Sequence, residues 1–332
     1  MAEPNWPDLE YDEWKETCET LHRWTQIVGK IRLSKSPWVN HSWHSTLYVT
    51  EKGLTTSVIH DRESSFAIEF DFISHVLRMS RSDGREMSLP LKSQSVATFF
   101  GSCLSCLDEL EVEAAIHEKP NELADAIPFS QDHTHNTYDP DFANRFWKVL
   151  LQCDRLMKDF RSRFSGKASP VHFFWGGLDL ATTRFSGRNA PEHPGGIPNL
   201  PDLVTREAYS DEVSSCGFWP GNELYPTAAF YSYAYPEPEG YKRATVPDGA
   251  SYEEKLREFV LPYRAVKAAG SPDRLVLDFF LSAYEAAANL GKWDRAALEG
   301  SRYLKILQGR AKTDGSAADV RPRAATRPTP RG

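Results

Sequence analysis

The segment from residue 169 to residue 221 holds the densest group of side chains that could do chemistry. It mixes histidine, aspartate, glutamate and arginine with aromatic residues, glycines and prolines. Imidazole and carboxyl groups are common general acids and bases, and a guanidinium group can hold a carboxylate or a phosphate. The segment is therefore our candidate site, although no motif within it specifies a reaction.

We predict that His172, His193 and Glu207 are the catalytic groups of this site. Each has a purely structural alternative. His172, in the run PVHFFW, could be a half-buried histidine bonded to a backbone carbonyl, and His193, in EHPGG, could simply belong to a turn. Glu207 could lie on a solvated acidic helix face.

Four further residues are predicted to bind the substrate: Arg184 as an anion clamp, together with Asp179, Trp175 and Trp219. Asp179 could instead pair with a nearby arginine or cap a turn. Arg184 could equally hold the following loop in place.

The glycine pair at 176 and 177 decides whether His172 and Asp179 can act together. On one continuous strand they would lie more than roughly 20 Å apart. If the glycines form a hairpin turn, Phe174 pairs with Asp179, and His172 becomes a diagonal neighbour at roughly 7–8 Å. The possible internal repeat favours the continuous strand, because the corresponding run SWHSTLYVT reads as a single strand.

The sequence leaves the cofactor unknown. His172, His193, Glu207 and Asp179 could together form a mixed nitrogen and oxygen metal site, but their spacing fixes no distances. Glu207 and Asp211, four residues apart on a predicted helix, could also supply paired carboxylates for a divalent metal. No glycine-rich dinucleotide motif and no P-loop occurs, so a nucleotide is not supported.

Composition limits the possible partners. The formal net charge of −7 in 332 residues argues against a nucleic acid or an anionic membrane, and no apolar run is long enough to cross a bilayer. The acidic start lacks the pattern of a signal peptide, and five scattered cysteines are typical of free thiols. We expect a cytoplasmic protein with a small-molecule partner, and the oligomeric state stays open.

Hydrophobic periodicity and turn residues predict the elements that must position these groups. Helices are expected at residues 11–32, 94–110, 139–160, 203–215, 253–269 and 273–290. Strands are expected at residues 42–50, 54–60, 66–91 (at least two), 111–119, 170–178 and 228–235. The Cys103-x-x-Cys106 pair lies within an apolar helical pattern and has no second pair, which favours a buried helix over a zinc site.

This order of elements predicts an α+β fold with antiparallel sheets flanked by helices. We expect an N-terminal half at 1–128, a linker at 129–136, a C-terminal half at 137–310 with a long loop at 186–201, and a disordered tail at 311–332. A shift of 133 residues superimposes Trp14 on Trp147 and the Ser-Pro pair at 36–37 on that at 169–170. The halves could therefore be pseudo-repeated helix–sheet–helix units packed as one globule.

Several long motifs, in order, give the chain a family resemblance. They are WPDL, TQIVGKIRL, SPWVNHSWH, SPVHFFWGGLDLATTRFSGR, HPGGIPNLP, TREAYSDEVSSCGFWPG and YSYAYPEP. Together they resemble a bacterial family known as domain of unknown function 5996, over about residues 6–299. The resemblance implies a soluble single-family protein, and it brings no reaction, cofactor or catalytic residue.

Two functions are consistent with these observations. The first is an enzyme acting on a small polar or anionic substrate at the 169–221 segment. The alternative is a non-catalytic small-molecule-binding protein with an aromatic pocket. Its lining would be Trp43, Phe174, Trp175, Phe218, Trp219, Tyr231 and Tyr233.

Overall fold

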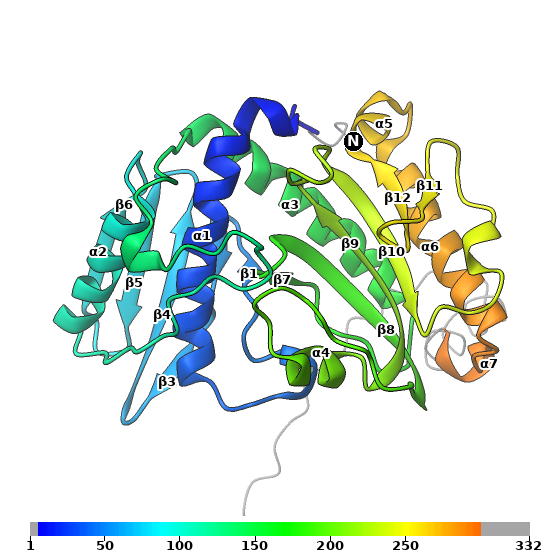
Figure 1. Cartoon of the computed structure of the whole chain (residues 1–332), viewed down its shortest axis with the longest axis horizontal. Helices are drawn as coiled ribbons and strands as arrows, with labels where there is room; N and C mark the ends of the chain where they lie inside the picture. Colours follow the sequence, from blue (N-terminus) through cyan, green and yellow to red (C-terminus); the bar gives the residue numbers. More distant parts are fainter. Residues whose placement is uncertain (1–5, 300–332) are drawn as a thin grey trace, which may run out of the picture.

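A computed structural model describes residues 6–299 and confirms the α+β class (Figure 1). Two antiparallel six-stranded sheets lie side by side, one from each half of the chain. The strands of the N-terminal sheet are β1 (Tyr48–Val49), β2 (Gly53–Thr55), β3 (Ile59–Asp61), β4 (Ser64–Asp71), β5 (Val76–Arg81) and β6 (Glu86–Pro90). Those of the C-terminal sheet are β7 (His172–Phe174), β8 (Asp179–Asn189), β9 (Asp211–Trp219), β10 (Ala229–Tyr235), β11 (Ser251–Glu253) and β12 (Glu258–Pro262).

Seven α-helices accompany the sheets in the described residues. They are α1 (Tyr11–Lys35), α2 (Val96–Glu109), α3 (Pro140–Ser162), α4 (Asp202–Ala208), α5 (Tyr263–Ala268), α6 (Pro272–Leu290) and α7 (Arg295–Leu298). The long helices start and stop close to the predicted residues. Asp139 caps α3 by accepting hydrogen bonds from the backbone N–H groups of Asp141 and Phe142, as its position before Pro140 predicts.

The N-terminal sheet buries one face against α1 and α2. Its strands alternate, so that Phe66, Ile68 and Phe70 of β4 point inward and the residues between them are less buried. Trp24 of α1 stacks on Phe99 of α2 with ring centroids 4.5 Å apart. This contact ties the two helices into one layer over the sheet.

The C-terminal sheet has the strand order β11-β12-β10-β9-β8-β7, and α3 and α6 cover one of its faces. Phe160 of α3 and Phe230 of β10 each pack against Phe280 of α6. Helix α4 lies on the opposite side of this sheet (Figure 1). The sheet therefore lies between the two long helices α3 and α6 on one side and the short helix α4 on the other.

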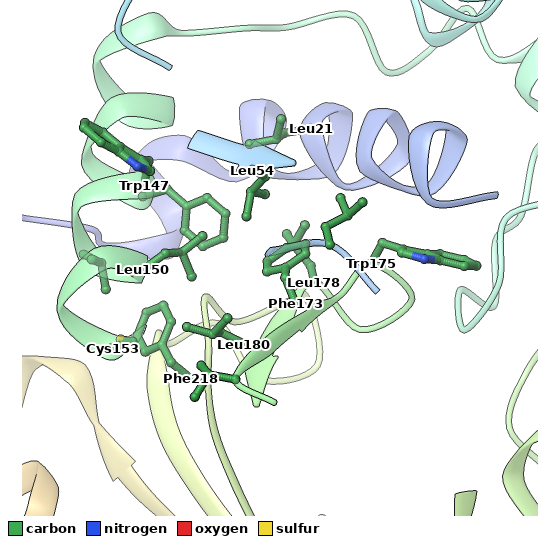
Figure 2. Close-up of a cluster of buried hydrophobic side chains, with 14 of the residues drawn as sticks. Leu21, Leu54, Trp147, Leu150, Cys153, Phe173, Trp175, Leu178, Leu180 and Phe218 are labelled. Atoms are coloured by element: carbon green, nitrogen blue, oxygen red, sulfur yellow. The ribbon is translucent and has the colours of Figure 1, made fainter. Parts of the chain in front are cut away.

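The two halves share a core. Leu47, just before β1, exchanges two backbone hydrogen bonds with Phe173 of β7, at 2.9 and 2.7 Å. Figure 2 shows Leu21 and Leu54 from the first half beside Phe173 and Leu180 from the second. One continuous buried cluster therefore runs through both halves, which share the order helix, sheet, helix; their descent from a repeat stays a prediction.

Several local expectations were wrong. The glycines at 176 and 177 lie in a hairpin loop, and Phe174 pairs with Asp179, so β7 and β8 are two strands and not one. The run at 42–50 begins at the end of a 3₁₀ helix (Asn40–Ser42) and continues as a turn, with only Tyr48–Val49 as strand, so the repeat misled the prediction at this point. Local turn chemistry outweighs a weak internal alignment.

Three other elements differ from the prediction. Residues 111–119 form no strand. The helix predicted at 203–215 ends at Ala208, so Glu207 lies on this helix, α4, whereas Asp211 begins β9. Residues 253–269 form β12 and the short α5 where a single helix was expected. Tertiary pairing with β10 overrides the helical pattern there. The predicted tail at 311–332 lies outside the described residues, and no helix in residues 6–299 is long and apolar enough to cross a membrane.

Candidate functional site

The C-terminal sheet presents two different faces because side chains alternate along each strand. Along β8, Leu180 and Arg184 point toward α3 and are buried. Asp179, Ala181 and Thr183 point the other way and line a cavity. The neighbouring strands continue this second face, which we call the cavity face, through residues that include Tyr231 of β10.

The cavity has a volume of about 760 Å³. Its floor is the cavity face, and its walls and roof come from the end of α1, the turn at residues 38–45, the loops at 117–122 and 197–201, and α4. Aromatic rings form much of the lining: Trp38, Trp43, Phe174, Trp175, Phe185, Tyr209, Trp219, Tyr231 and Tyr233. This size and character are typical of small-molecule sites.

Three carboxyl groups line the part of the cavity that we call the acidic end: Glu122 and Asp179, which both lie near Gly177, and Glu258, whose pKa is influenced by the charge of Asp179. Asp179 opens β8 and accepts a hydrogen bond from the Tyr231 hydroxyl. Asp179 Oδ1 lies 2.8 Å and Glu122 Oε2 lies 3.8 Å from the point where a Cβ on Gly177 would stand. A Cβ on Gly176 would lie only 1.9 Å from Glu122 Oε1, so glycine is required there for the carboxylate to pack over the hairpin.

Glu122 is held at the acidic end by backbone contacts on both sides. Its N–H donates to the carbonyl of Pro198 at 2.9 Å, and the Asn121 side chain donates to the carbonyl of Asn199 at 2.6 Å. Gln26 of α1 donates to the Asn121 carbonyl at 2.9 Å. These bonds keep Glu122 in the left-handed region, at φ +63°, which non-glycine residues adopt rarely and at an energetic cost.

The acidic end raises the pKa values of all three carboxyl groups. Burial raises the pKa of Asp179 to about 6, although the Tyr231 hydrogen bond opposes the rise. Burial, with a smaller contribution from the negative charge of Asp179, raises the pKa of Glu258 to about 8. The same two causes raise the pKa of Glu122, although its side chain is exposed to solvent in the cavity lining. Protons are therefore gained and lost here near neutral pH.

Positive charge does not balance this acidic end. Neither Glu122 nor Glu258 forms an ion pair or a side-chain hydrogen bond within the described part of the chain. Lys30 is the one lysine or arginine among the described lining residues, and its Nζ donates to the carbonyl of Lys119 at 2.9 Å. Burial lowers its pKa to about 8.

Hydroxyl groups complete the cavity face. The hydroxyls of Tyr209 and Tyr233 are hydrogen-bonded at 2.9 Å, as are those of Thr183 and Ser215. Gly217 of β9 leaves room for the Tyr231 ring, because a Cβ there would lie 2.4 Å from the ring and hydroxyl atoms. The cavity face thus offers both stacking surfaces and hydrogen-bonding groups.

Of the residues predicted from sequence, Asp179, Trp175 and Trp219 line the cavity. The predicted aromatic pocket lines it as well, except for Phe218, which is buried on the face toward α6. Sequence reasoning missed Glu122 and Glu258. Glu122 lies in a loop between the two halves, and Glu258 was placed on a helix.

The two predicted histidines do not line the cavity. His172 is fully buried against Trp43, Tyr48 and Phe174. Neither of its ring nitrogens has a partner among the described residues, and burial lowers its pKa to about 3. His193 stacks on Tyr209, and its Nδ1 accepts a hydrogen bond from the Gly195 N–H at 3.0 Å. Catalytic roles for both stay predictions that this placement does not favour.

Glu207 and Arg184 are also outside the lining. Glu207 Oε1 accepts a hydrogen bond from Trp38 Nε1 at 2.7 Å, which ties α4 to the turn after α1. Arg184 is 2 % exposed and lies over the rings of Phe160 and Tyr284, 3.5 and 4.2 Å from their centroids. Because it points away from the cavity, Arg184 cannot clamp an anion bound there.

The predicted metal site does not form within residues 6–299. His172, His193, Glu207 and Asp179 each have separate surroundings, and no group of three histidine, cysteine, aspartate or glutamate residues in this range could hold a metal ion. Cys103 lies buried on α2, as the helical pattern predicts, and the thiols in the described range are free.

Comparison with known proteins gives one match. A family model described as a family of unknown function (DUF5996) matches residues 6–300. No curated protein and no solved structure matches the chain. The cavity and its side chains are therefore the basis for any statement about function.

Proposed function

We propose that this chain, which belongs to the DUF5996 family of unknown function, binds a small organic molecule in the cavity between the C-terminal sheet and α4. One observation carries the proposal. A cavity of about 760 Å³ has aromatic rings over much of its surface, with carboxyl and hydroxyl groups among them. Rings provide contact area, and the polar groups orient the ligand.

The aromatic lining favours the binding function over an enzyme that acts on an anionic substrate. An anion would need a cationic clamp, and Arg184 points into the packed face. A second candidate, acid–base catalysis on the bound molecule, is favoured by one observation. Asp179 and Glu122 face each other beside Gly177 with raised pKa values, as catalytic carboxyl pairs do.

Two tryptophan substitutions on α4 test the binding proposal. Val204 lines the cavity, whereas its neighbour Leu203 is 71 % exposed and faces away. We expect Val204→Trp to fill part of the cavity and Leu203→Trp to leave it open. A thermal-shift screen of a library of small organic molecules should find ligands that stabilise the wild type and Leu203→Trp but not Val204→Trp.

Direct titration calorimetry then compares each stabilising compound across the three proteins, after circular dichroism shows that both variants are folded. Binding that is equally strong in Val204→Trp would place the ligand elsewhere. A library that yields no ligand at all would also contradict the proposal.

A further inference from the structure

The acidic end of the cavity has three carboxyl groups, and none of them forms an ion pair within residues 6–299. Several other half-buried or buried carboxylates of this fold have a cationic partner, whereas Glu69 and Glu237 accept hydrogen bonds from hydroxyl groups. Asp132 lies 3.3 Å from Arg23, Asp61 lies 3.0 Å from Lys35, and Asp211 lies 2.8 Å from Lys167. Removing a carboxylate from bulk water is costly without such a partner.

The half-buried Asp179 and Glu258 lack this compensation, and the exposed Glu122 has no cationic partner either. Asp179 has a neutral donor, the Tyr231 hydroxyl, and the other two carboxyl groups have no ion pair in residues 6–299. Lys30 does not supply the charge. Its Nζ is directed at the Lys119 carbonyl and lies 5.9 Å from the ring centroids of Phe129 and Trp175.

We infer that the molecule held in this cavity is a small organic cation, with its ammonium group among Glu122, Asp179 and Glu258 and its apolar part against the tryptophan and tyrosine rings. The inference rests on the proposed function and names the chemical class of its ligand. Carboxylates and aromatic faces are the two protein groups that attract a cation most strongly at short range.

The aromatic surfaces lie where such a ligand requires them. Tyr231 extends over Gly217 toward Asp179, and its ring stacks with that of Tyr233 at 6.1 Å. Trp175 follows Phe174 in the same hairpin as Asp179 and lines the cavity beside Gly176. An ammonium group beside Gly177 would therefore have carboxylate oxygens on one side and rings on the other.

The other charge classes fit less well. An anionic ligand would add a like charge to the acidic end, and a neutral ligand would leave its carboxyl groups without a cationic partner. A cation, by contrast, is held best by the ionised forms. Because burial raises the pKa values of Asp179 and Glu258 to about 6 and about 8, its binding should also release protons near neutral pH.

Three indole compounds of similar shape separate the charge classes: tryptamine is a cation, tryptophol is neutral and indole-3-acetate is an anion. Calorimetric titration at pH 8 should show tryptamine binding at least about tenfold more tightly than tryptophol, with no measurable binding of indole-3-acetate. Titrations at pH 7 in buffers of different ionisation enthalpy should show proton release with tryptamine and none with tryptophol.

Charge-neutralising variants locate the ammonium group. Glu122→Gln and Glu258→Gln should each weaken tryptamine binding by about fivefold to tenfold and leave tryptophol binding unchanged. Glu63→Gln is the matched control, since it makes the same change of charge in the exposed turn between β3 and β4. It should leave both affinities unchanged.

The inference is wrong if tryptophol or indole-3-acetate binds as tightly as tryptamine, or if tryptamine, phenethylamine and choline all fail to bind. Neutral or anionic compounds whose binding disappears in Val204→Trp would then leave the proposed function intact while removing the cation. Failure of every compound in the library would remove both.

Discussion

The two faces of the C-terminal sheet differ in what surrounds their charged side chains. Arg184 and Asp179 lie on the same strand, β8, but on opposite faces. Arg184 is enclosed by the aromatic rings of α3 and α6 and donates to the Phe160 carbonyl. Asp179 faces a cavity that is also lined by the carboxyl groups of Glu122 and Glu258.

This contrast distinguishes Arg184, whose charge has a structural role, from Asp179, whose charge is a candidate for function. The fold itself encloses Arg184 between aromatic rings and a backbone carbonyl, which leaves no room for another molecule on the packed face. On the cavity face, burial raises the pKa values of Asp179 and Glu258, with a smaller contribution from the charge of Asp179 to that of Glu258, and neither forms an ion pair in the described residues. The unbalanced face is the one that leaves room for a ligand.

Substitution of Arg184 should have the largest effect on folding. Arg184→Ala removes buried side-chain packing and cation–π contacts, and we expect it to lower the free energy of unfolding by about 3 kcal/mol in urea titrations. The exposed Arg188 on the same strand pairs with Glu212, and Arg188→Ala should cost about 1 kcal/mol or less. Equal losses in the two variants would show that Arg184 is not a structural centre of the packed face.

Adding a methyl group to the cavity face at Gly217 should have an intermediate effect on the free energy of unfolding. In Gly217→Ala the new Cβ would lie 2.4 Å from the Tyr231 hydroxyl and 2.6 Å from the Leu180 carbonyl oxygen, so Tyr231 must move. We expect a loss of about 2 kcal/mol and weaker tryptamine binding. Gly101→Ala on α2, where a Cβ meets nothing within 4 Å, should instead stabilise the protein by about 0.5 kcal/mol. Unchanged tryptamine affinity in Gly217→Ala would contradict a role for Tyr231.

The smallest effect on stability should come from Asp179→Asn, and it should depend on pH. Burial raises the folded-state pKa of Asp179 from 3.8 to about 6, so the folded protein holds this proton more tightly than the unfolded chain. Its contribution to stability therefore falls as pH rises from about 4 through 6. Asparagine removes this loss while still accepting the Tyr231 hydrogen bond.

We accordingly expect Asp179→Asn to unfold at a temperature a few degrees higher than the wild type at pH 8, and at the same temperature at pH 4. Tryptamine affinity should fall in the same variant. A variant that unfolds at a lower temperature than the wild type at pH 8, with the difference disappearing toward acid pH, would mean that Asp179 is ionised and stabilising in the folded protein.

Much of the secondary structure could be predicted from sequence because its signals are local. The apolar spacing of α1, the Asp-Pro start of α3 and the Ser-Asp-Gly turn between β5 and β6 depend on neighbouring residues alone. Most of the aromatic lining was also predictable. Phe218 was assigned to the wrong face. Adjacent residues of a strand point to opposite faces, so Phe218 and Trp219 cannot both line the cavity.

The sequence by itself determined the α+β class, the main helices and a segment rich in tryptophan and tyrosine. Only the tertiary structure decided which charged groups meet. Glu122 and Glu258 lie 57 residues before and 79 residues after Asp179, and they reach it through a pinned loop and through strand pairing. Arg184 lies outside the site because an odd number of residues separates it from Asp179 on β8, and this places the two side chains on opposite faces of the strand. Neither long-range approach nor strand register is contained in local spacing, since both depend on packing the whole chain.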